Sequence, residues 1–459
     1  MPWLSFKEAM ELNRPFLVFV HSPTLPLSRR IKDRLEELNI DAAIVDWHRE
    51  PEIARRLTEY PPRMLAFFPG WKIAPMDGVS PDKLKKIDPT DLSPQPVKEE
   101  LPLSWRALRE EILGELSKNL LFLYDPYRAG FGYSPKFTES DAINAATALW
   151  CMDRDIRYRM IAEDTLNVIL NSPMTEGGLV STFSYSPDWR EPSKEYTAEH
   201  QAKIAVSMIY AAKSIPNPYL TKRAAEAIEA AEKLRILSGR EAFVLAWSYA
   251  ITYQALHKKR LLEAAQRLLR SAEPRKTYIE DACEKGHALL ELYMTTGSRE
   301  YLKEATECAQ ELKRFLHQEA FVDTTLDLPP RYPVRANARA CELLLKIHAI
   351  TGEEQMRDLA TKVLCRIAKK GVDRGIEGLS LVVPMIIALY GCMKIELKGQ
   401  DPELHLAAMT LINPIRVIVH RDAPHASASL CFGEICFPET RDPNQLRDYI
   451  VSLLIRGGR

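Results

Sequence analysis

Cysteine is absent from this 459-residue chain until Cys151. The attacking group in thiol–disulfide exchange is a thiolate, so the chain before Cys151 cannot carry out that reaction. An excess of charge of one sign is absent too, because 62 basic residues balance 62 acidic ones. This balance argues against partners attracted by bulk charge, so neither a nucleic acid nor a membrane surface is expected.

Long apolar runs and nucleotide-binding motifs are also missing. No apolar run is long enough to span a bilayer, and no Walker or dinucleotide fingerprint occurs, so no cofactor is expected. The histidines and cysteines near the C-terminus are spaced more loosely than in structural zinc motifs, so a metal is not the expectation there. Acidic residues at Glu8 and Glu11 interrupt the start, which is unlike a signal peptide, and a cytoplasmic location is the expectation. Six cysteines are scattered over separate helical segments and fit buried thiols: Cys151, Cys283, Cys308, Cys341, Cys365 and Cys392.

Residues 1–90 have the pattern of an α/β domain. The apolar run at 16–20 predicts a buried strand, a basic amphipathic helix follows at 29–38, and a second strand follows at 42–46. Pro51 opens a short helix, and Ser80 is expected to cap the last one. The order of elements resembles thioredoxin.

The thioredoxin resemblance makes Pro62 the expected cis-proline. The loop that would hold the Cys-x-x-Cys pair is instead Pro23–Ser28, where Thr24, Leu27 and Ser28 carry no thiol. The domain is therefore predicted not to be a disulfide oxidoreductase. A docking or scaffolding role, with a possible protein partner at this domain, is the interpretation that remains.

Residues 91–104 form a linker rich in proline, and amphipathic helices fill residues 105–400. About twelve helices are expected there. Two segments, 289–312 and 344–367, each contain a helix that ends at Thr-Gly and is followed by a second helix, with Gly297 and Gly352 as left-handed terminators. Six such hairpins closed in a ring give an (α/α)6 toroid; an open α-solenoid is the alternative.

Residues 401–459 change pattern again. Two strands are expected at 415–420 and 426–432, followed by a helix at 443–454. The predicted fold is therefore multidomain: a thioredoxin-like α/β domain, an (α/α)6 toroid and a small C-terminal α/β extension.

Three motifs resemble the spermatogenesis-associated thioredoxin-domain family. They are Gly130-Phe-Gly-Tyr-Ser-Pro-Lys-Phe137, the segment from Gly177 to Trp189, and the pair Cys431 and Cys436. The resemblance implies a six-hairpin barrel related to glycosidases and N-acylglucosamine epimerases. The chain departs from the family at its missing Cys-x-x-Cys and at Ser193, where the family has histidine.

The first candidate site is the loop before the helix at Asp141. Tyr133 and Lys136 are candidates to bind a ligand there. The structural alternative is that the glycines allow tight turns and that Phe131 and Phe137 plug the barrel.

The segment 183–195 is the second candidate. Tyr185 and Trp189 offer aromatic faces on which sugars stack, and Asp188 and Glu195 are candidate catalytic carboxylates. His200 is a candidate catalytic imidazole, although a satisfied structural histidine is the alternative. This loop and the preceding one are separated by two helices, so both are expected at the same end of the ring.

Further along the chain, Glu280, Asp281, Arg335 and Asn337 are candidate substrate-binding residues near the cup. Helix capping or a surface role explains the same residues without a ligand. Near the C-terminus, Cys431 and Cys436 lie close to two histidines, and a metal site, a disulfide and two free thiols all remain open.

The sequence is compatible with two functions. The first is a carbohydrate-active protein, a sugar isomerase, epimerase or hydrolase, whose substrate is a sugar or sugar-derived small molecule bound in the cup. The second is a non-catalytic scaffold or binding protein. A deep cup lined by Trp189, Glu195 and Glu280 favours the first, and a shallow or plugged cup favours the second.

Overall fold

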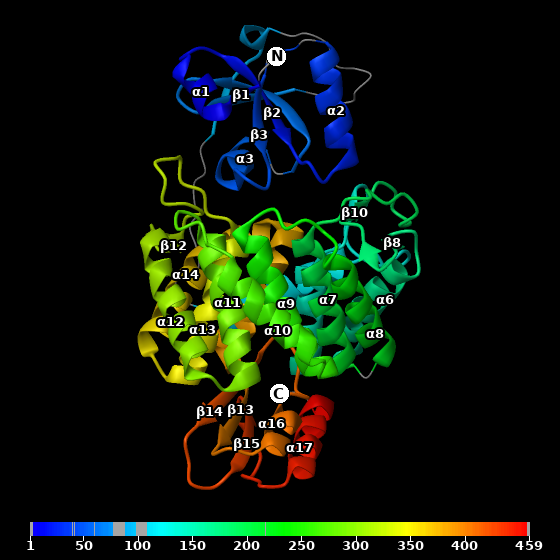
Figure 1. Ribbon diagram of the computed structural model, residues 1–459, viewed down its shortest axis with the longest axis vertical. Helices are drawn as coiled ribbons and strands as arrows, with labels where there is room; N and C mark the ends of the chain where they lie inside the picture. Colours follow the sequence, from blue (N-terminus) through cyan, green and yellow to red (C-terminus); the bar gives the residue numbers. More distant parts are fainter. Residues whose placement is uncertain are drawn as a thin grey trace.

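The structure is a computed structural model that describes residues 3–38, 40, 42–58, 60–76, 88–97, 108–215 and 217–456. Three parts follow one another along its longest axis (Figure 1): a mixed α/β domain at one end, a body of helices in the middle, and a small α/β unit at the other end. The predicted fold class is confirmed. Within the described residues, no helix has the length and apolarity needed to cross a bilayer.

The N-terminal domain is built on a mixed sheet of strand order β1-β3-β2-β4-β5-β6, in which β1, β2 and β3 are parallel. Its elements are β1 (Leu4–Ser5), α1 (Phe6–Glu11), β2 (Phe16–His21), α2 (Pro26–Glu37), β3 (Ala43–Asp46), α3 (Pro51–Leu57), β4 (Arg63–Phe68), β5 (Lys72–Pro75) and β6 (Gln95–Pro96). The arrangement is consistent with a thioredoxin-like domain. The expected helix at Ser80 lies outside the described residues.

Alternation along β2 explains why this strand is apolar throughout. Val18 and Val20 pack in one core with Phe6 of α1, whereas Leu17 and Phe19 pack in a second core with α2. A strand with both faces covered must be apolar at consecutive positions. The peptide bond between Pro61 and Pro62 is cis, as expected at Pro62.

Within the part of the chain that the structure describes, twelve helices, α4 to α15, form the body of the molecule. The inner ones are α5 (Ser140–Asp153), α7 (Ala198–Ser214), α9 (Gly239–Leu256), α11 (Ile279–Thr296), α13 (Val334–Thr351) and α15 (Val382–Tyr390). The outer ones are α4 (Glu110–Leu123), α6 (Ile156–Leu170), α8 (Pro218–Ala231), α10 (Lys259–Ser271), α12 (Arg299–Glu311) and α14 (Glu354–Asp373).

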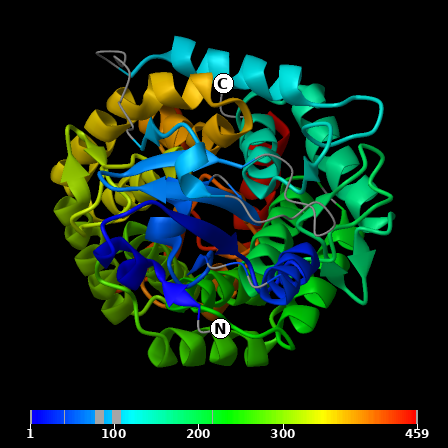
Figure 2. The ribbon, with the colours of Figure 1, turned by 90° about the horizontal axis from the view of Figure 1, so that it is seen from above.

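Contacts between the inner helices show that the ring closes. Each inner helix packs on the next, and α15 packs back on α5. The view from above shows the helices arranged in a ring (Figure 2). The inner helix α9 buries nearly all of its residues, whereas the outer helix α10 buries only one stripe. A toroid needs this division between helices buried all round and amphipathic helices. The open solenoid is therefore excluded.

Glycine ends the two helices of the internal repeat, as predicted. Gly297 follows α11 with φ +72°, and Gly352 follows α13 with φ +79°. A left-handed residue at this position lets the chain turn directly into the next helix. The outer helices α12 and α14 then begin within two residues.

The C-terminal unit contains a sheet of order β14-β13-β15-β16. Its elements are β13 (Met393–Lys398), α16 (Pro402–Ala408), β14 (Arg416–Arg421), β15 (Ser427–Phe432), β16 (Ile435–Cys436) and α17 (Pro443–Arg456). This sheet begins before residue 400. Arg416 extends from β14 into the ring and binds Gln254 Oε1 at 2.8 Å and Glu291 Oε1 at 2.5 Å, so the unit covers the end of the ring opposite the N-terminal domain.

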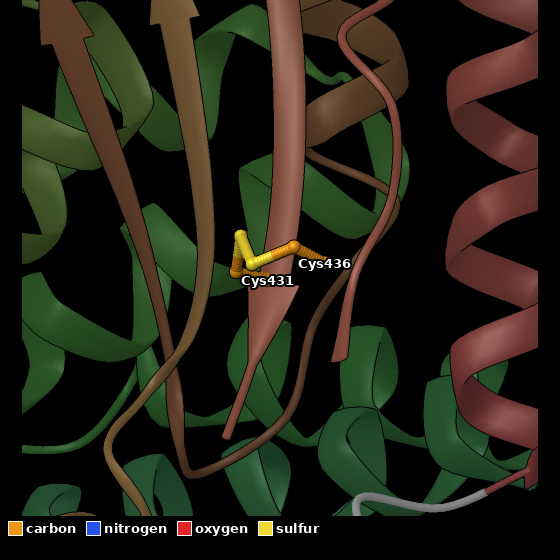
Figure 3. Close-up of a disulfide and its surroundings, with 2 residues drawn as sticks. All are labelled: Cys431 and Cys436. Carbon is orange, nitrogen blue, oxygen red and sulfur yellow. A yellow bond between two sulfur atoms is a disulfide. The ribbon is translucent and has the colours of Figure 1, made fainter. Parts of the chain in front are cut away.

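Cys431 and Cys436 form a disulfide (Figure 3). They face each other directly on the antiparallel strands β15 and β16, which brings their Cα atoms to 4.2 Å. Of the three alternatives for this pair, the structure has the disulfide. Among the described residues, no group of three histidine, cysteine or acidic side chains is placed to hold a metal ion.

Candidate functional site

A cavity of about 450 Å³ lies at the end of the ring where the inner helices begin. The N-terminal domain covers this end (Figure 2) and contributes Trp47 and Arg55 to the wall. Its described lining contains eight basic side chains: Arg55, Lys203, Arg240, Arg331, Arg335, Arg339, Lys370 and Arg374. It also contains five acidic ones: Asp141, Glu199, Glu280, Glu284 and Glu377. The cup is therefore neither plugged nor apolar.

One group of charges centres on Arg240, at the start of α9. Its guanidinium binds Glu199 Oε2 at 2.6 Å and also binds Glu280, which in turn binds Arg55. Lys203, one turn after Glu199 on α7, binds the other oxygen of Glu199 at 2.7 Å. Two carboxylates, from the first turns of α7 and α11, are thus held between three cations, which belong to α7, α9 and α3 of the N-terminal domain.

The cations of this group control the acidity of its carboxyl groups. Burial by itself raises the pKa of Glu199, but the charges of Arg240 and Lys203 outweigh burial and lower that pKa to about 2. Burial also raises the pKa of Glu280, and the charges of Arg55 and Arg240 again outweigh it, so that pKa lies well below its usual range. Both carboxyl groups are therefore ionised at neutral pH.

A second group centres on Arg335 near the start of α13. Arg335 Nη2 binds Glu139 Oε2 at 2.6 Å, and Arg335 Nε binds Asp141 Oδ2 at 3.0 Å. Burial raises the pKa of Glu139, the neighbouring charge of Asp141 adds to this, and Arg335 opposes it. This side of the site therefore has a carboxyl group that keeps its proton more readily than a solvated glutamate does.

The wall next to α13 combines a cation with an aromatic face. Arg339 lies over the ring of Trp247 at 5.0 Å and binds Glu284 Oε2 at 2.9 Å. Trp247 is almost fully buried. Asn144 also lines the cavity, and its side-chain oxygen has no hydrogen-bond partner among the described residues.

Two of the eleven predicted site residues line the cavity, Glu280 and Arg335. The other nine do not: Tyr133, Lys136, Tyr185, Asp188, Trp189, Glu195, His200, Asp281 and Asn337. The expected meeting of the two loops is confirmed, because β7 (Lys136–Phe137) pairs with β10 (Phe183–Ser184). The residues of those loops, however, mostly contact each other.

Lys136 and Trp189 fasten the two loops together. Lys136 is fully buried, binds Asp125 Oδ2 at 2.9 Å and lies 5.2 Å from the ring of Trp189. Trp189 is also fully buried and donates from Nε1 to the carbonyl of Arg128 at 3.0 Å. Tyr133, by contrast, is largely exposed.

The three predicted catalytic residues also have partners away from the cavity. Asp188 is half exposed and pairs with Arg190. Glu195 accepts hydrogen bonds from Thr24 of the N-terminal domain at 2.9 Å and from Thr182 at 2.9 Å. His200 lies 3.1 Å from Thr138 Oγ1, and burial lowers its pKa to about 4.

Contacts within the fold also account for Tyr185, Asp281 and Asn337. Tyr185 packs edge-on against Phe183. Asp281 is fully buried and accepts from the backbone N–H of Arg275 at 2.8 Å. Asn337 is hydrogen-bonded to both backbone groups of Phe321, at 2.8 and 2.9 Å.

The residues that sequence reasoning missed share one signal. Glu199 and Lys203 lie in the first turns of α7, Arg240 is the second residue of α9, and Arg339 lies one turn after Arg335 on α13. Charged side chains in the first turns of alternate helices mark the open end of a toroid. Trp47 and Arg55 lie outside the ring and give no such signal.

A glycine substitution tests the structural role of the two loops. Gly130 has φ +80°, and a Cβ there would lie 2.4 Å from Trp189 Cζ2. We expect Gly130→Ala to destabilise the barrel by about 2–4 kcal/mol, through backbone strain and displacement of the indole. Gly132→Ala is the matched control: its φ is +79°, its Cβ would meet no atom closer than 3.6 Å, and about 1 kcal/mol is expected. Equal losses in urea unfolding would contradict a packing role for Trp189.

Comparisons with known proteins concern the barrel. No protein-family model matches the chain, and no curated protein matches its sequence. Among solved structures, a sugar epimerase from a ruminal bacterium is 12% identical and superposes on 56% of this chain and 86% of its own, with a TM-score of 0.49.

Two other solved structures are similar to the same extent. The cellobiose 2-epimerase of Bacillus thermoamylovorans is 10% identical over 58% of this chain and 87% of its own, with a TM-score of 0.48. The GH76 α-mannanase BT2949 of Bacteroides thetaiotaomicron is 10% identical over 61% and 95%, with a TM-score of 0.47. The likeness is distant and concerns the fold.

Proposed function

We propose that the cavity binds a small, hydroxyl-rich molecule that carries negative charge, such as a sugar acid or a sugar phosphate. The observation that carries this proposal is the cavity itself, which is closed over by the N-terminal domain and lined by more basic than acidic side chains. The inner helices begin at this end, and helix N-termini favour an anion. A volume of about 450 Å³ is within the range of small-molecule sites.

Two other features of the lining support a sugar. Trp47 is a partly exposed aromatic side chain of the kind that packs on the C–H face of a sugar ring. The buried side-chain oxygen of Asn144 needs a donor, and a sugar hydroxyl supplies one. Hydroxyl groups also suit a wall that contains both carboxylates and guanidinium groups.

We further propose that the chain acts on this molecule as an isomerase, an epimerase or a hydrolase. Proton transfer is assigned to the Glu139 and Asp141 pair, because Asp141 lines the cavity and burial raises the pKa of the adjoining Glu139. Arg335 binds both carboxyl groups and holds them in place. Glu199 and Glu280 are assigned to ligand binding, because their ion pairs keep them ionised.

Membership of the spermatogenesis-associated thioredoxin-domain family is part of the same proposal. The motif at 130–137, the cysteine pair near the C-terminus and the order of an α/β domain before a helical ring all support it. A carbohydrate substrate class is in keeping with this assignment.

Calorimetry on the purified full chain tests the binding proposal. Glucose, glucose 6-phosphate, glucuronate and inorganic phosphate are the probes. We expect the two charged sugars to bind at least about tenfold more tightly than glucose, and added salt to reduce that difference. No binding by any probe, or equal binding of charged and neutral sugars, would overturn the proposal.

The catalytic assignment needs a separate variant. Asp141→Asn should lower turnover of the bound sugar, followed by NMR, at least about a hundredfold while leaving its affinity within about threefold. Asp358→Asn, at an exposed position on the outer helix α14, is the matched control and should change neither. Turnover by Asp141→Asn at the rate of the unchanged chain would remove this carboxylate from the chemistry.

A non-catalytic binding protein is the second candidate. The observation in its favour is that Glu199, Glu280 and Glu284 are all held in ion pairs. Binding of a charged sugar without any turnover would select it. A docking role for the N-terminal domain is less favoured, because the face that bears Ser22 and Thr24 already contacts the barrel.

A further inference from the structure

The N-terminal domain contributes side chains to the cavity from one edge of its sheet. Strands β2 and β3 are parallel neighbours that end at His21 and Asp46. Ser22 follows the first and Trp47 the second, and α3 begins four residues after Trp47, at Pro51. In open α/β sheets the carboxyl ends of parallel strands are where ligands bind. In this chain that edge meets the mouth of the barrel.

Arg55 on α3 is held in one position by three different groups. It binds Glu280, and its guanidinium carbon lies 5.8 Å from the ring of Trp47 and 5.9 Å from the ring of Tyr278. Its side chain is 19% exposed. An arginine fixed in this way is already oriented for a ligand and loses little conformational entropy on binding.

Contacts that do not line the cavity hold the domain in place. Arg56 binds both carboxylate oxygens of Asp323 at 2.8 Å, and both side chains are almost fully buried. Arg275 reaches Glu52 Oε2 at 3.5 Å, and Thr24 binds Glu195 at 2.9 Å. The domain therefore has anchors other than Trp47 and Arg55.

We infer that Trp47 and Arg55 are ligand-contacting residues that determine specificity, and that the thioredoxin-like domain has become one wall of the barrel's binding site. Trp47 packs on the face of the sugar ring, and Arg55 binds its anionic group. The inference rests on the proposed function of the cavity. It gives the domain a role that needs no thiol.

Replacing Arg55 and replacing Trp47 should reduce the affinity for sugars in different ways. Arg55→Gln keeps a hydrogen-bonding side chain but removes the charge. It should therefore lower the affinity for glucose 6-phosphate and glucuronate by at least about tenfold while changing the affinity for glucose by less than about twofold. Trp47→Leu removes the aromatic face and should lower the affinity for all three sugars. A merely structural role for Arg55 would weaken the neutral and charged sugars alike.

Calorimetry with the full chain and these three sugars is the experiment. Arg49→Gln is the matched control: Arg49 belongs to the same domain, its side chain is 67% exposed, and it does not line the cavity. It should bind every probe as the unchanged chain does.

The outcomes separate the inference from the proposed function. If the unchanged chain binds the charged sugars and Arg55→Gln and Trp47→Leu bind them equally well, the inference is overturned and the proposed function stands. If the unchanged chain binds none of the three sugars, both fail. Loss of charge selectivity in Arg55→Gln alone, with Arg49→Gln unaffected, establishes the role of Arg55.

Discussion

Replacing Arg56 with alanine is expected to weaken the packing of the N-terminal domain on the barrel by about 3–5 kcal/mol. The substitution leaves Asp323 buried with its main counter-charge removed, and an unpaired buried charge costs about that much. Burial already raises the pKa of Asp323, and Arg56 opposes this. Without Arg56 the carboxyl group takes up a proton more readily, which limits the loss.

Urea unfolding of the full chain and hydrogen exchange of the α3 amides measure this loss. The double variant Arg56→Met with Asp323→Leu removes both charges and should recover most of the stability, because an apolar pair of similar volume can replace a buried ion pair. Arg49→Ala, at an exposed position, should change stability by less than about 0.5 kcal/mol. If Arg56→Ala behaves like Arg49→Ala, the ion pair does not hold the domains together.

Local patterns in the sequence carried enough information to predict most of the fold. The apolar run in β2 predicts a strand with two covered faces, and Gly297 and Gly352 end their helices because of their own conformational freedom. These are properties of short segments. Closure of the ring is different, because it depends on contact between α15 and α5, which are more than two hundred residues apart. Periodicity within one hairpin cannot distinguish a closed ring from an open solenoid.

The site was predictable only in part, for a related reason. The aromatic residues and glycines at 130–137 and 183–189 predict that two loops meet, and they do. Lys136 and Trp189, however, contact each other and the surrounding loops and do not line the cavity. Glu280 and Arg335 were found because they lie in or near the first turns of inner helices. Arg55 could not be found this way, because its place in the wall depends on packing between two domains.

Four histidines, two of them buried and two partly buried, predict a large loss of stability between pH 7 and pH 5. Burial lowers the pKa of His21, His200, His287 and His420 to about 4 each, from an ordinary value of 6.5. Below pH 6.5 the unfolded chain therefore binds protons that the folded chain does not, so stability falls as the pH falls and the loss is complete near pH 4. Each histidine contributes about 2 kcal/mol by pH 5. Glu241, whose pKa burial raises to about 7, acts in the opposite direction and offsets about one of them.

His200→Gln isolates one of these contributions. His200 is partly buried against Thr138 in the barrel, and this burial lowers its pKa to about 4, so the variant should lose about 2 kcal/mol less than the unchanged chain between pH 7 and pH 5. Urea unfolding at both pH values, followed by far-ultraviolet circular dichroism, gives the difference. His425→Gln is the matched control, since His425 is exposed, and it should keep the full pH dependence. An identical loss in His200→Gln and His425→Gln would show that His200 accepts its proton without unfolding, and the burial argument would fail at that residue.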